Sequence, residues 1–435
     1  MQDEASTIEK ENVAPAVDSE AAEASEPDAA DLDEDLLETE QNPLPRLKDI
    51  AMSAKASAPV ETSEPVENPE PAEASDADGA PPPGSGPTPD PAPAAPEPLE
   101  AAKQVLERLR ARMRAQVLGR DDVIDLVLVA LLADGHVLLE DFPGSGKTTL
   151  AKSLGTSITA AVADAVAGEP ADAPVAPFRR IQFTPDLLPS DVTGVSIFET
   201  TTSTFSFRRG PIFAHVVLAD EINRTSPKVQ SAMLEAMAEK QVTVDNVTYP
   251  LDSLFFVIAT QNPLDLAGTY PLPVAQLDRF LFKIRMEHID RDAELEVLST
   301  WRSRRNVERE DLPKVTRADV LAARRAIDEE VAIDPRIQEA LVDIAQAVRE
   351  DERVLQGCST RSLVLMLPAL QALAALEGRD YVTGDDIARL APRVLGHRLE
   401  LVPGLSNTQD VIEDAVGKAI EGLSRGTLKG TSGRR

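Results

Sequence analysis

Two short stretches of this sequence carry residue types suited to chemistry on phosphate groups. In the first, an apolar run enters a Pro/Gly turn that ends in Lys147 and Thr148. Gly144 and Gly146 can adopt backbone conformations closed to other residues, so successive N–H groups can converge on an anion. The helix expected to follow adds free N–H donors and a partial positive charge. The stretch therefore predicts a phosphate-binding loop in which Lys147 reaches the β- and γ-phosphates and Thr148 binds Mg²⁺.

The loop departs from the G-x-x-x-x-G-K-[S/T] pattern at one position, because Asp141 stands where the first glycine is usually found. A Gly-Lys-Thr sequence also occurs by chance, so the stretch alone is compatible with an ordinary turn before a helix. A second stretch decides between the two, since an apolar run from His215 ends in the adjacent carboxylates Asp220 and Glu221. Asp220 would hold Mg²⁺ through its water, and Glu221 would polarise the attacking water. Together the two stretches predict a nucleoside triphosphatase.

The surrounding sequence predicts the elements that must position these residues. Apolar, β-rich runs separated by helical stretches indicate a mostly parallel sheet buried on both faces, hence an α/β layer fold. The five runs are His136–Glu140, Arg180–Phe183, His215–Asp220, Leu254–Thr260 and Phe280–Ile284. Helices are expected at Ala101–Met113, Asp121–Leu132 and Leu363–Leu376, and a small β-hairpin at Phe198–Phe207.

The charge of the chain is concentrated at its N-terminus. The 435 residues carry a net charge of -30, and the first hundred hold 26 Asp and Glu against 4 Lys and Arg. The same segment holds 17 of the 34 prolines and no aromatic residue, so its apolar burial cannot offset the entropy of ordering. Residues 1–98 are therefore expected to form a disordered acidic tail. The remainder, with 48 acidic and 40 basic groups, is not basic enough to predict nucleic acid as its main partner.

The organisation beyond this tail also follows from composition. We expect a nucleotide-binding α/β domain at 101–286, a helical domain at 287–402 and a polar C-terminal tail at 403–435 that frays. An Ala/Pro/Asp-rich stretch at 160–178 predicts an inserted surface loop. A single cysteine, no signal peptide and no run of 18 apolar residues predict a cytoplasmic protein without a membrane span.

Four longer stretches resemble the AAA+ ATPases and, within that class, the MoxR family. They are RIQFTPDLLPSDVTG (180–194), GPIFAHVVLADEINRTSPKVQSAMLEAMAEKQVTV (210–244), FFVIATQNPLDLAGTYPLPVAQLDRF (255–280) and GRDYVTGDDIARLAPRVLGHRL (378–399). The resemblance implies an AAA+ P-loop NTPase fold, in which a parallel five-stranded sheet lies between helices and a helical lid domain follows.

The resemblance also implies roles for single residues. Asn262 matches sensor 1, an amide that orients the attacking water, and Arg279 in LDRF matches the arginine finger that reaches the neighbouring subunit's site. Arg361 matches sensor 2 of the lid, although Ser359 and Thr360 stand where the family usually has Ser-Pro.

The remaining nucleotide contacts are also implied by the resemblance. The apolar segment before Arg120 resembles the part of the family that packs against adenine, and the loop after the first strand supplies the phosphate contacts. The residues expected to bind the nucleotide are Val117, Leu118, Gly119, Pro143, Gly144, Ser145, Gly146, Lys147, Thr148 and Thr149. The hairpin region Asp191–Arg209 resembles an insert that lines the upper face of the ring.

Taken together, the resemblance implies an ATPase that uses ATP and Mg²⁺ and assembles as a ring, a hexamer. It implies a chaperone-like role in remodelling or activating protein clients, with a partner that carries a von Willebrand factor A domain. Two alternatives stay open: an AAA+ motor acting on nucleic acid, and a nucleotide-dependent scaffold whose acidic tail does the binding. The mild acidity of the folded part counts against the first, and the complete set of catalytic residues counts against the second.

Overall fold

The structure is a computed structural model of the chain. It describes residues 96–140, 144–159, 175–262, 268–305 and 312–431, which belong to one compact unit. The expected acidic tail up to residue 95, residues 141–143 of the phosphate loop and 160–174 of the expected insertion lie outside the described residues.

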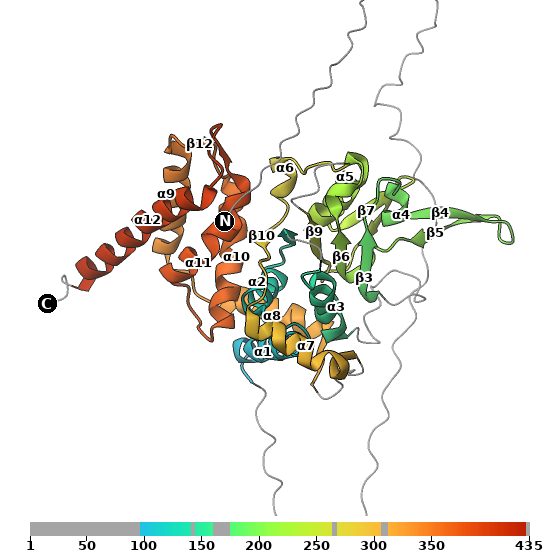
Figure 1. The fold of residues 1–435 in the computed structure, drawn as a ribbon, viewed down its shortest axis with the longest axis horizontal. Helices are drawn as coiled ribbons and strands as arrows, with labels where there is room; N and C mark the ends of the chain where they lie inside the picture. Colours follow the sequence, from blue (N-terminus) through green and yellow to red (C-terminus); the bar gives the residue numbers. More distant parts are fainter. Residues whose placement is uncertain (1–95, 141–143, 160–174, 263–267, 306–311, 432–435) are drawn as a thin grey trace, which may run out of the picture. The chain divides into compact units, whose positions relative to one another are not determined.

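Five parallel strands form the central sheet, in the order β10-β1-β9-β6-β3 (Figure 1). They are β1 (Val137–Glu140), β3 (Ala176–Gln182), β6 (Ala214–Asp220), β9 (Phe256–Gln261) and β10 (Phe282–Arg285). Every residue of β6 is buried, as expected for a strand covered on both faces. The predicted parallel five-stranded sheet is therefore confirmed.

Helices cover both faces of this sheet. Successive residues of a strand point to opposite faces, so neighbouring residues enter different hydrophobic cores. Leu139 of β1 packs in one hydrophobic core and its neighbour Leu138 in a second. The first core includes side chains of α1 (Pro98–Gln116), α2 (Asp121–Leu132) and α3 (Lys147–Ser157). The second includes side chains of α4 (Pro189–Thr193) and α5 (Pro227–Glu239). The sheet thus lies between two helical layers, as the AAA+ fold requires.

Shorter elements complete this domain. The predicted hairpin is present, and Figure 1 shows it extending away from the sheet. Its strands are β4 (Gly194–Glu199) and β5 (Thr204–Arg209), and a second hairpin consists of β7 (Gln241–Val244) and β8 (Val247–Pro250). The others are η1 (Ile222–Arg224), α6 (Val274–Leu277), and β2 (Ile158–Thr159), which pairs with β11 (Val315–Thr316).

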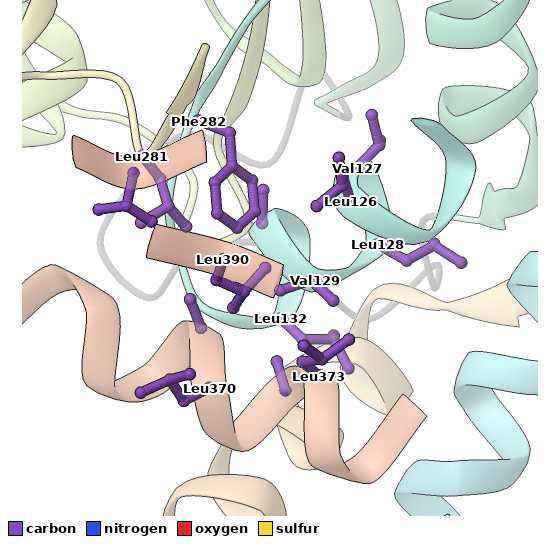
Figure 2. Close-up of a cluster of buried hydrophobic side chains, with 14 of the residues drawn as sticks. Leu126, Val127, Leu128, Val129, Leu132, Leu281, Phe282, Leu370, Leu373 and Leu390 are labelled. Atoms are coloured by element: carbon purple, nitrogen blue, oxygen red, sulfur yellow. The ribbon is translucent and has the colours of Figure 1, made fainter. Parts of the chain in front are cut away.

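The C-terminal part is helical, as predicted for the lid. Its helices are α7 (Arg291–Arg305), α8 (Arg317–Glu330), α9 (Pro335–Glu350), α10 (Thr360–Leu376), α11 (Gly384–Leu395), η2 (Gly396–Arg398) and α12 (Thr408–Thr431). A short β pair joins β12 (Val354–Gln356) to β13 (Glu400–Leu401). Figure 2 shows Leu370, Leu373 and Leu390 of this part packed with α2 and with Phe282 of β10. The lid and the sheet domain therefore share one core.

The C-terminal segment differs from the prediction. Residues 403–435 were expected to form a fraying tail, but α12 occupies most of this segment and packs against α9 and α11. Val411, Ile412, Ala415 and Val416 are all buried, at a spacing that places them on one helical face. The polar end of the sequence hid this amphipathic pattern. None of the helices in the described ranges is both long and apolar enough to cross a membrane.

Candidate active site

The predicted phosphate loop lies between the carboxyl end of β1 and the start of α3. Gly146 is the N-terminal cap residue of α3, and both Gly144 and Gly146 have φ of +93°, where a side chain would be strained. The first N–H groups of α3 have no partner within the helix and carry its partial positive charge. Lys147 and Thr148 begin that helix, whereas Pro143 lies outside the described residues. The local structure is the strand, loop and helix that anion binding needs.

A cavity of about 940 Å³ opens beside this loop. Of the residues predicted to bind nucleotide, Val117, Leu118, Gly144, Ser145, Gly146 and Thr149 line its wall. The lid contributes Ile289, Val297 and Leu298, so the apolar part of the cavity is formed from both domains. Gly119 is not in the wall but touches the lid, since a Cβ there would lie 2.6 Å from Cβ of Ala293.

Three buried polar atoms in the wall of this cavity have no hydrogen-bond partner among the described residues. They are Nε of Arg112, Nε of Arg120 and Oγ of Ser145. Burial also lowers the pKa of Arg112, whose Nη1 donates to the Leu312 carbonyl. Buried donors without partners are costly, and a nucleotide offers the acceptors they need. The cavity is therefore large enough for a nucleotide and offers hydrogen-bond donors for its acceptors.

The two predicted carboxylates lie at the carboxyl end of β6, where Thr260 of the neighbouring strand β9 fixes both. The Thr260 hydroxyl donates to Oδ1 of Asp220 at 2.7 Å and accepts the N–H of Glu221 at 2.9 Å. The other Asp220 oxygen accepts two hydrogen bonds from Arg180 of β3, the shorter at 2.6 Å. Asp220 is therefore held in one orientation at the edge of the sheet.

Glu221 adopts an uncommon backbone conformation directly after this strand. Its φ is +57°, in the left-handed region that non-glycine residues rarely occupy and that is often found at functional sites. Its Oε2 accepts a hydrogen bond from the side-chain amide of Gln182 at 2.8 Å and lies 3.5 Å from Nε of Arg224. The carboxylate is thus restrained by side chains from β3 and η1.

The donor set also suits the predicted metal. Thr148 offers a hydroxyl and Asp220 a carboxylate, and Mg²⁺ prefers oxygen ligands and keeps several of its waters. Because Arg180 already binds one Asp220 oxygen, the ion pair and a hydrated cation would compete for the same carboxylate. The residues fit the ion, and Arg180 is a partner that the sequence did not reveal.

The three residues assigned by resemblance lie in different places. Asn262 directly follows β9 and is buried, so it shares the sheet edge with Asp220. Arg279 is half-buried after α6. Arg361 lies in the first turn of α10, with its Nε 3.8 Å from Oδ2 of Asp278. Within the described residues, no hydrogen bond or ion pair is found between the Arg279 or Arg361 side chain and either Asp220 or Glu221.

Three polar side chains at this edge escaped the sequence analysis: Arg180, Gln182 and Thr260. Arg180 and Gln182 are two residues apart on β3, and this spacing places both side chains on the same face of the strand, which was the signal for a shared polar face. Their partners are about 40 residues away, so only the register between β3, β6 and β9 brings them together.

Known proteins resemble this chain over most of its length. Residues 136–282 match the ATPase family associated with various cellular activities (AAA), and residues 346–415 match the AAA lid domain. The uncharacterized protein YeaC of Bacillus subtilis is 49% identical over 66% of this chain and 84% of its own. Chaperone MoxR1 of Mycobacterium tuberculosis is 36% identical over 75% of this chain and 82% of its own.

A solved structure agrees with this match. The crystal structure of a Cytophaga hutchinsonii protein described as an ATPase is 35% identical, with a TM-score of 0.64, and covers 74% of this chain and 96% of that one. The relatives and the two matched families span both the sheet domain and the lid. The chain belongs to the MoxR family of AAA+ ATPases.

Proposed function

We propose that the protein hydrolyses ATP to ADP and phosphate, with Mg²⁺, and uses the reaction to remodel or activate client proteins. The observation that carries this proposal is the hydroxyl of Thr260, which fixes Asp220 and the backbone of Glu221 at one sheet edge. The phosphate loop leaves β1 at the same edge, because β1 and β6 both run parallel to β9. A positioned carboxylate pair beside an anion-binding loop is the arrangement that metal-assisted hydrolysis needs.

Each residue then has one task in the reaction. The α3 N-terminus and Lys147 bind the phosphates, and Thr148 and Asp220 hold the hydrated cation. Glu221 turns away from Gln182 to accept a proton from the attacking water, which Asn262 orients. ATP and Mg²⁺, when bound, supply the transferred phosphoryl group and the positive charge that neutralises it.

Arg279 is assigned to the neighbouring subunit's site, in a ring that we infer to be a hexamer. Its guanidinium has no hydrogen bond or ion pair with the described residues of its own chain, and its side chain is only half-buried. A guanidinium supplied from outside can stabilise the charge that develops on the phosphoryl group. Arg361 of the lid is assigned to the subunit's own site as sensor 2. These assignments rest on the family resemblance and on the positions of the two side chains.

The hairpin of β4 and β5 is the proposed site of client contact. Phe198 and Phe205 lie near its turn with ring centroids 5.1 Å apart, and the two side chains are 49% and 74% exposed. Val195 and Ile197 of β4 are also exposed, on the opposite face of the hairpin from Phe198 and Phe205, so the hairpin exposes apolar side chains on both faces. Exposed apolar patches commonly mark protein contacts. From the family resemblance, the proposal also includes a partner protein with a von Willebrand factor A domain that acts together with this ATPase.

The test is ATP turnover by Glu221→Gln, which keeps the shape of the side chain but removes the base. Turnover should fall at least a hundredfold while ATP binding is retained, because general-base catalysis contributes about 10²–10⁴-fold. Glu235→Gln, the same change on an exposed residue of α5, is the matched control. Unchanged turnover in Glu221→Gln would remove Glu221 from the reaction. Salt-dependent stimulation of turnover by DNA would favour a nucleic-acid motor instead.

The client is identified by capture on the same variant. Glu221→Gln in ATP should retain its client, and Phe205→Ser should reduce that retention without lowering basal ATP turnover. A client retained equally by Phe205→Ser would place the contact elsewhere on the molecule.

A further inference from the structure

We propose that Asp278 is a positioning residue that connects the lid of one subunit to the arginine it offers to the next. The inference rests on the proposed role of Arg279 and adds a residue that acts through it. Asp278 directly precedes Arg279, and its carboxylate contacts two lid arginines, Arg398 and Arg361.

Arg398 fixes the backbone on both sides of Arg279. It is only 3% exposed, and its Nε donates to Oδ1 of Asp278 at 2.7 Å. Its Nη2 donates to the carbonyls of Asp278, at 3.2 Å, and Phe280, at 2.7 Å. Its Nη1 donates to Leu281, at 3.3 Å, and to Val394 in α11. One guanidinium therefore joins the end of the lid to residues 278–281.

Arg398 is the desolvated member of this ion pair, whereas the Asp278 side chain is 26% exposed. Burial lowers the pKa of Arg398, and the hydrogen bond to Asp278 opposes this change. Breaking a buried ion pair leaves an uncompensated charge, so the segment cannot leave Arg398 without a large cost. The adjacent His397 Nε2 lies 3.1 Å from the Phe280 carbonyl and adds a second contact to the same segment. The backbone of Arg279 is thus placed by the lid, whereas its side chain has no such restraint from these groups.

The second oxygen of Asp278 lies beside Arg361, the residue proposed as sensor 2 of the subunit's own site. Arg361 lies with its Nε 3.8 Å from Oδ2 of Asp278, and its side chain is 59% exposed, so it can move. When Arg361 reaches toward a bound phosphate, Asp278 keeps Arg398 as its ionic partner. Nucleotide bound in a subunit's own site therefore changes the charge around Asp278. Because Arg398 of the lid holds the backbone on both sides of Arg279, a movement of the lid is passed on to Arg279. The geometry predicts that neighbouring sites in the ring influence each other through this carboxylate.

The test is Asp278→Asn in the full chain, which keeps the volume but removes the charge. Turnover should fall about 10–100-fold, as small misplacements of catalytic groups do. The Hill coefficient for ATP should fall toward 1, while ATP affinity changes less than about twofold. Asp410→Asn, on the exposed side of α12, should change none of these values. A Hill coefficient above 1 that Asp278→Asn leaves unchanged would overturn the inference.

Mixed rings separate this role from a merely structural one. Mixing Asp278→Asn with Lys147→Ala should restore turnover, because the second subunit supplies an intact Arg279 to the first one's intact site. If Arg279→Ala is rescued in this way and Asp278→Asn is not, the inference fails while the proposed function stands. If neither is rescued, the shared site itself is wrong. If Asp278→Asn does not assemble, Asp278→Glu replaces it, because it keeps the charge but moves it by one methylene. Asp278→Glu should likewise lower the Hill coefficient and be rescued by mixing with Lys147→Ala.

Discussion

The side-chain amide of Gln182 donates a hydrogen bond to the Glu221 carboxylate, with Nε2 and Oε2 2.8 Å apart. Gln182 is the last residue of β3 and pairs in register with Asp220, so the contact is built by the sheet. The carboxylate proposed to polarise water is therefore restrained by a residue on the neighbouring strand.

We predict that Gln182→Leu raises basal ATP turnover about two- to tenfold, the effect of removing one net hydrogen bond from the resting position of Glu221. Steady-state turnover measures this change. Gln241→Leu, on the exposed start of β7, serves as the control for the substitution itself. A drop in turnover in Gln182→Leu would mean that Gln182 holds Glu221 in its working position instead.

Thr260→Val is predicted to lower turnover about 10–100-fold and to raise the Mg²⁺ concentration needed for half-maximal rate. Valine keeps the shape of threonine, but Asp220 and the Glu221 N–H both lose a buried partner. A magnesium titration of the ATPase rate measures both effects. Thr243→Val, at an exposed position of β7, should behave as wild type. An unchanged magnesium requirement would separate Thr260 from the metal ligands.

Gly146→Ala tests whether the phosphate loop depends on its backbone conformation. A Cβ at this position meets no atom within 4 Å, so any loss comes from the φ of +93° and not from a clash. The strain should cost about 1–2 kcal/mol and weaken ATP binding about tenfold. Gly417→Ala in α12, with ordinary helical φ and open space, should instead stabilise the protein by about 1 kcal/mol. ATP titration and urea unfolding distinguish the two, and tight ATP binding by Gly146→Ala would contradict the assigned loop geometry.

Stability should fall as pH decreases below about 6.5, because two buried histidines are neutral in the folded protein. Burial lowers the pKa of His136 to about 4 and that of His397 well below its usual value. In the unfolded chain both titrate near pH 6.5, so the unfolded state binds more protons below that pH. Their contribution is full above about pH 6.5 and is lost progressively toward the folded pKa, by up to about 1.4 kcal/mol per pH unit for each histidine.

Urea unfolding between about pH 7.5 and about pH 5 measures this slope. His136→Gln should reduce the slope, whereas His288→Gln, on an exposed residue, should leave it unchanged. Stability that is constant or that rises on acidification would show that the two histidines do not control this range.

The sequence predicted those parts of the site that are contiguous in the chain or that end a strand. Gly144 to Thr149 are consecutive, and Asp220 and Glu221 end an apolar run. The local pattern alone therefore predicted that they lie at the carboxyl edge of the sheet. The helical pattern after residue 287 predicted a separate helical domain, and the family resemblance then identified it as the lid. Both kinds of inference depend on residues that are close together in the sequence.

The parts that were not predicted depend on distant pairing. Thr260 reaches Asp220 only through the register of β6 and β9, and Arg398 reaches Asp278 across 120 residues. The helix α12 was missed for another reason, because the glycines and charges near the C-terminus obscured the apolar face formed around Ile412 and Val416. Tertiary packing decided these features.

The most direct test of the account is ATPase activity per subunit, measured over a wide range of protein concentration. If Arg279 of one subunit completes the site of the next, specific activity should climb with concentration and then level off as rings form. Arg279→Ala should stay near zero throughout and regain activity when mixed with Lys147→Ala. A specific activity that is high and constant from the lowest concentration upward would contradict a site shared between subunits.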